Sequence, residues 1–142
     1  MKGPTPQNEH LPTEDGGYQI YKAAGKLKGK KAIITGGDSG IGRAIAIMFA
    51  MEGCDSLIAY LEVEEKDAQE TKRKVEEYGG QCHLLAVDLK KRDDCHKVVD
   101  MAMEKMGAIN ILVNNAAFQK TIQDIHELTE YVVPFTCRLD IR

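Results

Sequence analysis

A glycine-rich segment between two apolar segments constrains the fold of this chain more than any other feature. The short apolar run 32–34 ends at Thr35, and the sequence TGGDSGIG over residues 35–42 continues from it. Residues 40–51 are apolar on most faces, as expected of a helix packed against a sheet, and Gly53 gives that helix a natural end. The sequence therefore predicts a buried strand, a tight glycine turn and a helix in direct succession.

The spacing of the glycines in this turn suits a phosphate-binding site. Gly36 can adopt backbone angles that other residues avoid, Gly40 lets the backbone approach a ligand closely, and Gly42 lets the helix pack against the strand. The N–H groups at the positive end of the helix would then hold a dinucleotide pyrophosphate. The candidate cofactor-binding residues of the turn are Thr35, Gly36, Ser39, Gly40, Ile41 and Gly42. The spacing is GxxxGxG and not the standard GxGxxG, so an ordinary strand-to-helix turn is the alternative.

Strand and helix patterns alternate along the rest of the chain. Further strands are predicted at 57–60, 83–87 and 111–113, and amphipathic helices at 64–78 and 93–106. Such alternation indicates right-handed βαβ units. We therefore expect an α/β fold of the Rossmann type, an incomplete doubly wound parallel sheet in the strand order 3-2-1-4 with helices on both faces. The inner stripe expected for the helix at 64–78 is Ala68, Thr71, Val75 and Tyr78.

Polar residues follow the third and fourth predicted strands. Asp88 and Leu89 come after the third strand, and the run NNAA at 114–117 comes after the fourth. Ligands of such sheets bind beyond the carboxyl ends of the strands, so both segments should lie beside the glycine turn. Asp88, Leu89, Asn115 and Ala116 are therefore candidate cofactor-binding residues. The alternatives are that Asp88 only caps the next helix and that the Asn pair is ordinary turn chemistry.

Together these segments resemble the short-chain dehydrogenase/reductase family. The family's marks are TGxxxGxG, an acidic residue after the third strand and NNAG after the fourth. This chain has TGGDSGIG, Asp88-Leu89 and NNAA, with Ala117 in place of the last Gly. The segment PTEDGGYQ at residues 12–19 is similar to the glucose/ribitol dehydrogenase-like branch. The resemblance covers roughly residues 10 to 130.

The resemblance implies a cofactor, a reaction and roles for several residues. The cofactor is NAD or NADP, and hydride passes between the nicotinamide and an alcohol or carbonyl substrate, with a sugar or polyol expected from the branch. Asp88 and Leu89 would contact the adenine ring, and the backbone at 114–116 would line the adenosine ribose and help to fix the central sheet. The family forms homo-oligomers, and the oligomeric state of this chain stays open.

The 2′ position of the cofactor is expected at the end of the second strand. Tyr60 lies there as a candidate cofactor-binding residue, and Glu62 lies just beyond it. If Glu62 accepts hydrogen bonds from the ribose hydroxyls, the site favours NAD. An equal alternative is that Glu62 is only a solvated residue in the first turn of the next helix. Arg43 could reach a 2′-phosphate, but a position on the surface of its helix is the preferred expectation.

The groups that move protons in the family are not found in this sequence. By resemblance the chemistry needs a Tyr, a Lys four residues later and a Ser. The match to Tyr-x-x-x-Lys is Tyr18 to Lys22, which precedes the fold, so no catalytic residue is assigned. Pro134 breaks the helix that a family member would continue past Glu130. The chain is therefore expected to be a truncated relative, and an inactive variant that only binds nucleotide or a partner is the alternative function.

Composition and the terminal segments complete the expected organisation. Residues 1–17 are expected to form a flexible arm, residues 18–130 the dinucleotide-binding half-domain and residues 131–142 an atypical tail. The net charge of −3 lacks the basic footprint of a nucleic-acid-binding protein, and no segment approaches the apolar length of a membrane span. The four cysteines form no CxxC pair, and the Cys-His pairs at 82–83 and 95–96 lack zinc spacing. Reduced thiols, no metal site, no secretory signal and a cytoplasmic location are therefore expected.

Overall fold

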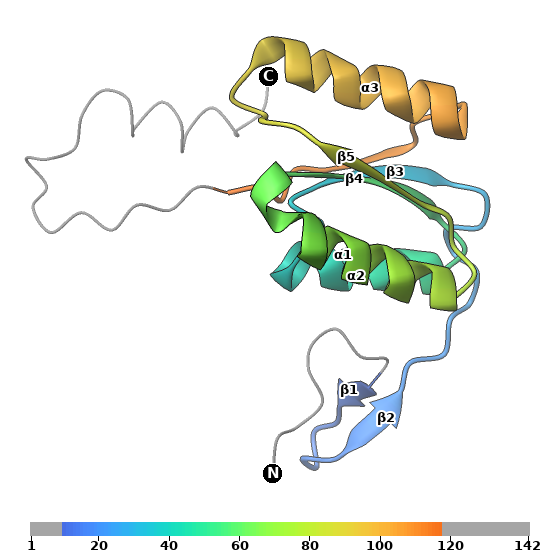
Figure 1. Ribbon diagram of the computed structural model, residues 1–142. Helices are drawn as coiled ribbons and strands as arrows, with labels where there is room; N and C mark the ends of the chain where they lie inside the picture. Colours follow the sequence, from blue (N-terminus) through green and yellow to red (C-terminus); the bar gives the residue numbers. More distant parts are fainter. Residues whose placement is uncertain (1–9, 118–142) are drawn as a thin grey trace, which may run out of the picture.

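The computed structural model describes residues 10–117. A four-stranded parallel sheet lies between helices, and a two-stranded hairpin precedes it (Figure 1). Each strand and helix predicted between residues 32 and 113 is present, with its ends no more than two residues from those expected. In chain order the elements are β1 (His10–Pro12), β2 (Tyr18–Ile20), β3 (Lys31–Thr35), α1 (Gly40–Met51), β4 (Asp55–Tyr60), η1 (Glu62–Glu64), α2 (Glu65–Glu77), β5 (Cys82–Ala86), α3 (Arg92–Met106) and β6 (Ile111–Val113).

The sheet has the strand order β5-β4-β3-β6, which confirms the predicted order 3-2-1-4. All three strand pairs are parallel. The register pairs Thr35 of β3 with Ala59 of β4, and Ala59 in turn with Leu85 of β5. On the other side of β3, Ile34 pairs with Val113 of β6. The carboxyl ends of the four strands therefore lie along one edge of the sheet, as the sequence analysis requires for a site there.

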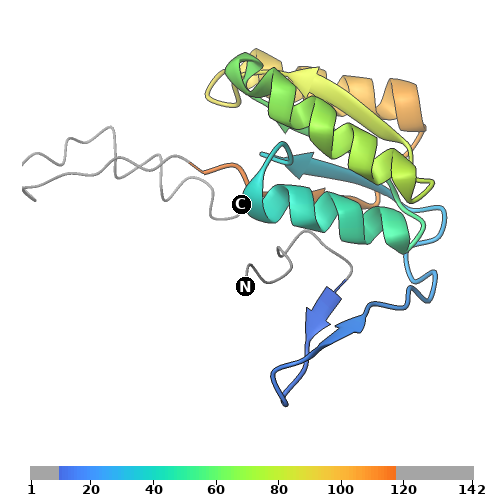
Figure 2. The ribbon, with the colours of Figure 1, turned by 60° about the horizontal axis from the view of Figure 1, so that its bottom comes forward.

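Helices cover both faces of the sheet, with α1 and α2 on one face and α3 on the other (Figures 1 and 2). Successive strand residues point to opposite faces, so adjacent residues enter different cores. Ile34 and Ile58 belong to the core beneath α1 and α2, whereas Ile33 and Leu57 belong to the core beneath α3. This two-sided burial explains why the strand sequences are nearly continuous apolar runs.

Helix α2 follows its predicted stripe except at the last position. Ala68, Thr71 and Val75 are fully buried, as expected. Tyr78, expected in the same stripe, is 39% exposed, so that prediction is wrong. The physical reason is that α2 ends at Glu77 and Tyr78 is its C-cap, outside the helical angles that would continue the stripe.

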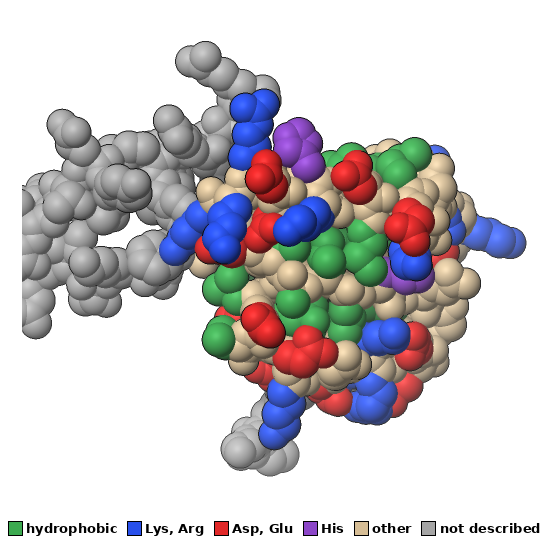
Figure 3. Space-filling view, turned by 45° about the horizontal axis from the view of Figure 1, so that its top comes forward, with side chains coloured by type: hydrophobic (Ala, Val, Ile, Leu, Met, Phe, Trp, Pro, Cys, Tyr) green, Lys and Arg blue, Asp and Glu red, His purple; other side chains and the backbone are tan. Residues whose placement is uncertain are grey.

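The side of the molecule that carries α3 exposes apolar groups. Figure 3, turned so that this side comes forward, shows hydrophobic side chains gathered in the middle of the face with charged side chains around them. Val99 and Met103 of α3 are about half exposed, and Leu112 of β6 is 59% exposed. Within residues 10–117, no strand pairs with the outer edges of β5 and β6.

The expected flexible arm contains a strand that the sequence analysis missed. β1 and β2 form an antiparallel hairpin in which His10 pairs with Ile20. The amide of Thr13 donates to the carbonyl of Gly17 at 2.9 Å, and Gly16 adopts a φ of +80°, which suits glycine. Local turn chemistry forms this hairpin, so the hydrophobic pattern gives no sign of it. The predicted boundary at residue 130 and the tail 131–142 lie outside the described residues, and the division into domains stays a prediction.

The buried carboxylate of Glu52 ties the segment after the hairpin to the end of α1. Glu52 is 5% exposed and accepts hydrogen bonds from the Tyr21 hydroxyl, from the Lys26 amide at 2.7 Å and from the Ala24 amide at 3.2 Å. The Tyr21 hydroxyl, followed by the two amides, lowers the pKa of Glu52. A carboxylate is unfavourable at the negative end of a helix, so these donors are what make it tolerable there.

Candidate cofactor-binding site

The glycine turn lies at the carboxyl edge of the sheet between β3 and α1. The Gly36 amide donates to the carbonyl of Ala59 at 2.7 Å, which holds the turn against the end of β4. Gly36 adopts a φ of +63° and Gly40 a φ of +51°, and these angles favour glycine. The expected conformational role of Gly36 is therefore confirmed.

Gly42 packs against the turn more closely than any side chain allows. A Cβ atom at Gly42 would lie 2.1 Å from the carbonyl oxygen of Gly36 and 2.6 Å from the Asn115 Nδ2 atom. A Cβ atom at Gly40, by contrast, would meet nothing within 4 Å. The expected close packing is thus found at Gly42, and the space outside Gly40 is open, which leaves room for a ligand beside the turn.

The first turn of α1 is electrostatically suited to an anion. Ser39, the N-cap residue, has extended backbone angles, is exposed, and makes no side-chain capping hydrogen bond. No acidic residue lies in the first turn, and Ile41 is 74% exposed. The first amides of a helix have no intrahelical acceptor and carry the positive end of the helix dipole. A phosphate placed here would receive backbone hydrogen bonds without displacing a side chain.

Thr35 and Asn115 fasten the turn to the end of β6. The Thr35 hydroxyl donates to the Val113 carbonyl at 3.3 Å and accepts from the amides of Asn115 and Ala116, each at 3.0 Å. The Asn115 side-chain amide donates to the carbonyls of Thr35 at 3.1 Å and Gly36 at 2.9 Å. These contacts use both side chains to hold the backbone. The predicted proximity of the β6 end to the glycine turn is confirmed, and direct contact of Thr35, Asn115 or Ala116 with a cofactor stays a prediction.

Tyr60 at the end of β4 is buried in the protein interior. Its side chain is 6% exposed, and its hydroxyl donates to the carboxylate of Glu65. Burial, together with the hydrogen bond to Glu65, raises the pKa of Tyr60 to about 12. The phenol therefore stays protonated at neutral pH. A cofactor contact of Tyr60 remains a prediction.

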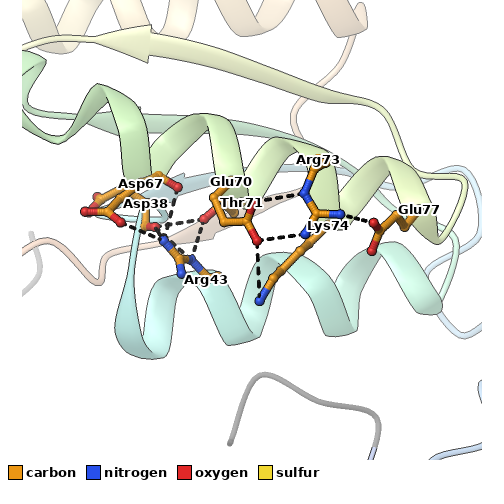
Figure 4. A network of polar contacts seen from close by, with 8 residues as sticks. All are labelled: Asp38, Arg43, Asp67, Glu70, Thr71, Arg73, Lys74 and Glu77. Atoms are coloured by element: carbon orange, nitrogen blue, oxygen red, sulfur yellow. Dashed lines mark hydrogen bonds and ion pairs between the residues drawn. The ribbon is translucent and has the colours of Figure 1, made fainter.

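The surroundings of Arg43 differ from the expected helix surface. Its side chain is 12% exposed and lies between α1 and α2 (Figure 4). Arg43 Nε donates to the Asp38 carbonyl at 2.9 Å and to Thr71 Oγ1 at 2.8 Å, and Nη2 donates to the Asp38 carbonyl at 2.6 Å. The predicted surface position is wrong because the carbonyl of buried Asp38 and the hydroxyl of Thr71 supply acceptors inside the helix junction. Glu62, in contrast, is exposed at the start of η1.

Asp88 and Leu89 lie after β5, on the same edge of the sheet. Asp88 Oδ1 accepts from the Lys90 amide at 3.1 Å, and the Asp88 amide donates to Asp94 Oδ2 at 3.1 Å. The Asp88 carboxylate thus closes a local turn over residues 88–90. It does not cap the next helix, the alternative weighed from the sequence, because the N-cap residue of α3 is Lys91 and no side chain caps that end. Lys97, and then the Asp88 amide, lowers the pKa of Asp94. Leu89 packs partly into the core beneath α3. The adenine contact expected of both residues stays a prediction.

Metal and membrane functions gain no support from the described residues. Residues 10–117 contain no group of three or more His, Cys, Asp or Glu side chains placed to hold a metal ion. Cys82 is buried at the start of β5, and Cys95 is exposed in the first turn of α3. Among the helices of this part of the chain, none has the length and apolar character needed to cross a membrane.

Comparison with known proteins agrees with this geometry. Residues 30–135 match the family model described as short chain dehydrogenase. The glucose and ribitol dehydrogenase homolog of Oryza sativa subsp. japonica is 45% identical over 134 residues, which are 88% of this chain and 45% of that protein. General stress protein 39 of Bacillus subtilis is 46% identical over 112 residues, 79% of this chain and 39% of that protein. The chain thus spans less than half the length of these relatives.

Solved structures give the same result. A short chain dehydrogenase from Burkholderia cenocepacia J2315 in complex with NADP is 32% identical, with a TM-score of 0.72 over 80% of this chain and 46% of the other. A short chain dehydrogenase from Mycobacterium paratuberculosis bound to NAD is 30% identical, with a TM-score of 0.70 over 80% of this chain and 46% of the other. The fold, the turn and these matches together show that the chain belongs to the short chain dehydrogenase family.

Proposed function

We propose that the chain binds NAD or NADP through the glycine turn and forms the cofactor-binding part of an oxidoreductase. The substrate would be an alcohol or carbonyl compound, and the similarity to the Oryza glucose and ribitol dehydrogenase homolog favours a sugar or polyol. The observation that carries the proposal is the uncapped first turn of α1 beside the open space at Gly40. Such a helix end favours a pyrophosphate, because both backbone donors and the helix dipole act on its charge. The cofactor supplies the hydride acceptor or donor when it is bound.

The remaining candidate residues would complete the cofactor site around this turn. Ser39, Gly40 and Ile41 would offer their backbone amides to the phosphates, and the open space at Gly40 supports this placement. Gly36 and Gly42 would set the shape of the turn. Asp88 and Leu89 would border the adenine, and Asn115 with Ala116 would border the ribose. Thr35 and Asn115 contribute by holding the turn in place, since their polar atoms bind the backbone.

Neither Tyr60 nor Tyr18 is suited to proton transfer to a substrate bound at the glycine turn. The buried Tyr60 has its pKa raised to about 12, the opposite of what an acid–base catalyst near neutral pH needs. Tyr18 lies on β2, outside the parallel sheet. We therefore expect no NADH or NADPH formation above background when the 142-residue chain is given glucose, ribitol or simple alcohols. Turnover that is lost on replacing one of the side chains at 10–117 would contradict this part of the proposal.

Calorimetric titration of the Gly40→Val variant with NAD+ and NADP+ tests the proposal. A β-branched side chain at a φ of +51° distorts the turn, and its methyl groups enter the space proposed for the pyrophosphate. The matched control is Gly79→Val, at a φ of +81° with equally open space at the end of α2. Binding should be lost in Gly40→Val and kept in Gly79→Val. Unchanged affinity in Gly40→Val would refute the assignment.

A further inference from the structure

We propose that this site takes NAD in preference to NADP, because Arg43 is held away from the cofactor and unpaired carboxylates border the position of the adenosine 2′ group. The inference rests on the proposed function and deepens it. A 2′-phosphate needs a cationic ligand, commonly an arginine near the glycine turn, whereas a 2′-hydroxyl is bound by a carboxylate. The discrimination therefore depends on which of these groups is available at the end of β4.

Arg43 is not available, because its guanidinium group joins α1 to α2. Beyond its bonds to the Asp38 carbonyl and the Thr71 hydroxyl, Nη2 donates to the Asp67 carbonyl at 3.1 Å and pairs with the Asp67 carboxylate at 3.4 Å (Figure 4). Thr71 is fully buried and itself donates to the Asp38 carbonyl at 2.8 Å. Turning Arg43 toward a phosphate would break its bonds to the Asp38 carbonyl and leave the buried Thr71 oxygen without a donor, which opposes that movement.

The segment beside the turn is acidic. The hydrogen bond from Gly36 to Ala59 fixes the glycine turn against the end of β4, and η1 begins two residues after that strand. Residues 61–67 hold four carboxylates and one lysine. Glu65 is hydrogen-bonded to Tyr60 and Gln69, and Asp67 pairs with Arg43. Glu62 and Glu64 make no ion pair with any residue in the described range 10–117.

Carboxylates at this position would repel the 2′-phosphate of NADP and accept hydrogen bonds from the ribose hydroxyls of NAD. A phosphate monoester carries about −1.5 to −2 charges at neutral pH, so a 2′-phosphate would face Glu62 and Glu64 without a neutralising arginine. The 2′- and 3′-hydroxyls of NAD would instead find carboxylate acceptors. Lys66 is exposed on α2, and Lys91 follows β5, which lies on the side of β4 away from the turn.

Calorimetric titration of the 142-residue chain with NAD+ and with NADP+ at low ionic strength measures the discrimination. We expect NAD+ to bind roughly tenfold more tightly or better, since one unscreened charge repulsion near a protein surface is of this order. Replacing both Glu62→Gln and Glu64→Gln should shrink the ratio of the two dissociation constants, chiefly by tightening NADP+. The matched control, Asp100→Asn with Glu104→Gln, also removes two exposed carboxylates, on α3, and should leave the ratio unchanged.

The Arg43→Gln variant shows whether Arg43 binds the 2′-phosphate or only joins the two helices. If Arg43 only joins the helices, the variant weakens both cofactors by the same factor and the ratio stays constant. A selective loss of NADP+ binding would show that Arg43 reaches the 2′-phosphate and would overturn the inference. NADP+ binding as tight as NAD+ to the unmodified chain overturns it as well, while leaving the proposed function standing. Binding of neither dinucleotide refutes the proposed function, and the inference falls with it.

Discussion

Replacing Gly42 by alanine should damage the turn more than any other single methyl group added to it. The new Cβ atom would lie 2.1 Å from the Gly36 carbonyl oxygen and 2.6 Å from Asn115 Nδ2. Both neighbours are held in place, the oxygen by the backbone and the amide by its bond to the same carbonyl. Overpacking costs about 1–3 kcal/mol, and loss of the Asn115 bond adds about 1 kcal/mol. We expect a total loss of roughly 3 kcal/mol, which lowers Tm by roughly 10–20 °C in a domain of this size.

Thermal unfolding monitored by circular dichroism measures this loss of stability. The matched control is the Gly40→Ala variant. The control adds the same methyl group where nothing lies within 4 Å, so only the backbone cost of a φ of +51° applies. That cost is about 1 kcal/mol. A Gly42→Ala variant no less stable than Gly40→Ala would refute the close packing of the helix start on the turn.

Three further predictions follow from contacts within the described residues. Asn115→Ala removes two hydrogen bonds that hold the turn to β6 and should cost about 1–3 kcal/mol in urea unfolding, whereas Ala at the exposed neighbour Asn114 should cost little. Because the pKa of Glu52 is lowered in the fold, its carboxylate contributes to stability above its ordinary pKa of 4.5, and this contribution is lost as pH falls through the folded pKa. Glu52→Gln should therefore reduce the loss of unfolding free energy at acidic pH. An unchanged pH dependence would contradict the role of Glu52 in holding the segment after the hairpin. Cys54 and Cys82, whose pKa burial raises to about 11, should resist a thiol reagent at neutral pH that labels exposed Cys95, as read by peptide mass spectrometry; equal labelling of the three would contradict their burial.

Periodicity and glycine chemistry made the parallel sheet predictable from the sequence. A strand buried on both faces is a continuous apolar run, and residues 32–34 of β3 are recognisable as one from the sequence alone. Residues 111–113 form a similar apolar run, although Leu112 is exposed on one face of β6. The βαβ alternation then limits the strand order, because crossovers keep one hand. The same argument brings Asn115 to the glycine turn, since parallel strands end at one edge. The hydrogen bonds of Asn115 to Thr35 and Gly36 show that contact directly.

Features set by contacts between distant residues could not be predicted in this way. The position of Arg43 depends on a carbonyl of the turn and on Thr71 of another helix, and neither acceptor is visible in a helical pattern. The exposure of Tyr78 depends on where α2 ends, and helix ends are the least certain part of a periodic pattern. The hairpin depends on turn hydrogen bonds at 13–17 and not on apolar alternation.

The central claim is that the amides of the glycine turn bind a dinucleotide diphosphate, and NMR of the 15N-labelled chain tests it most directly. Titration with NAD+ should shift the amide signals of Gly40, Ile41 and Gly42 in a saturable way, with smaller shifts at Asp88 and Asn115 on the same sheet edge. The amide of Gly79, at the far end of α2, should not move. Saturable shifts that spare residues 36–42, or the absence of saturable shifts in a folded chain, would contradict the claim.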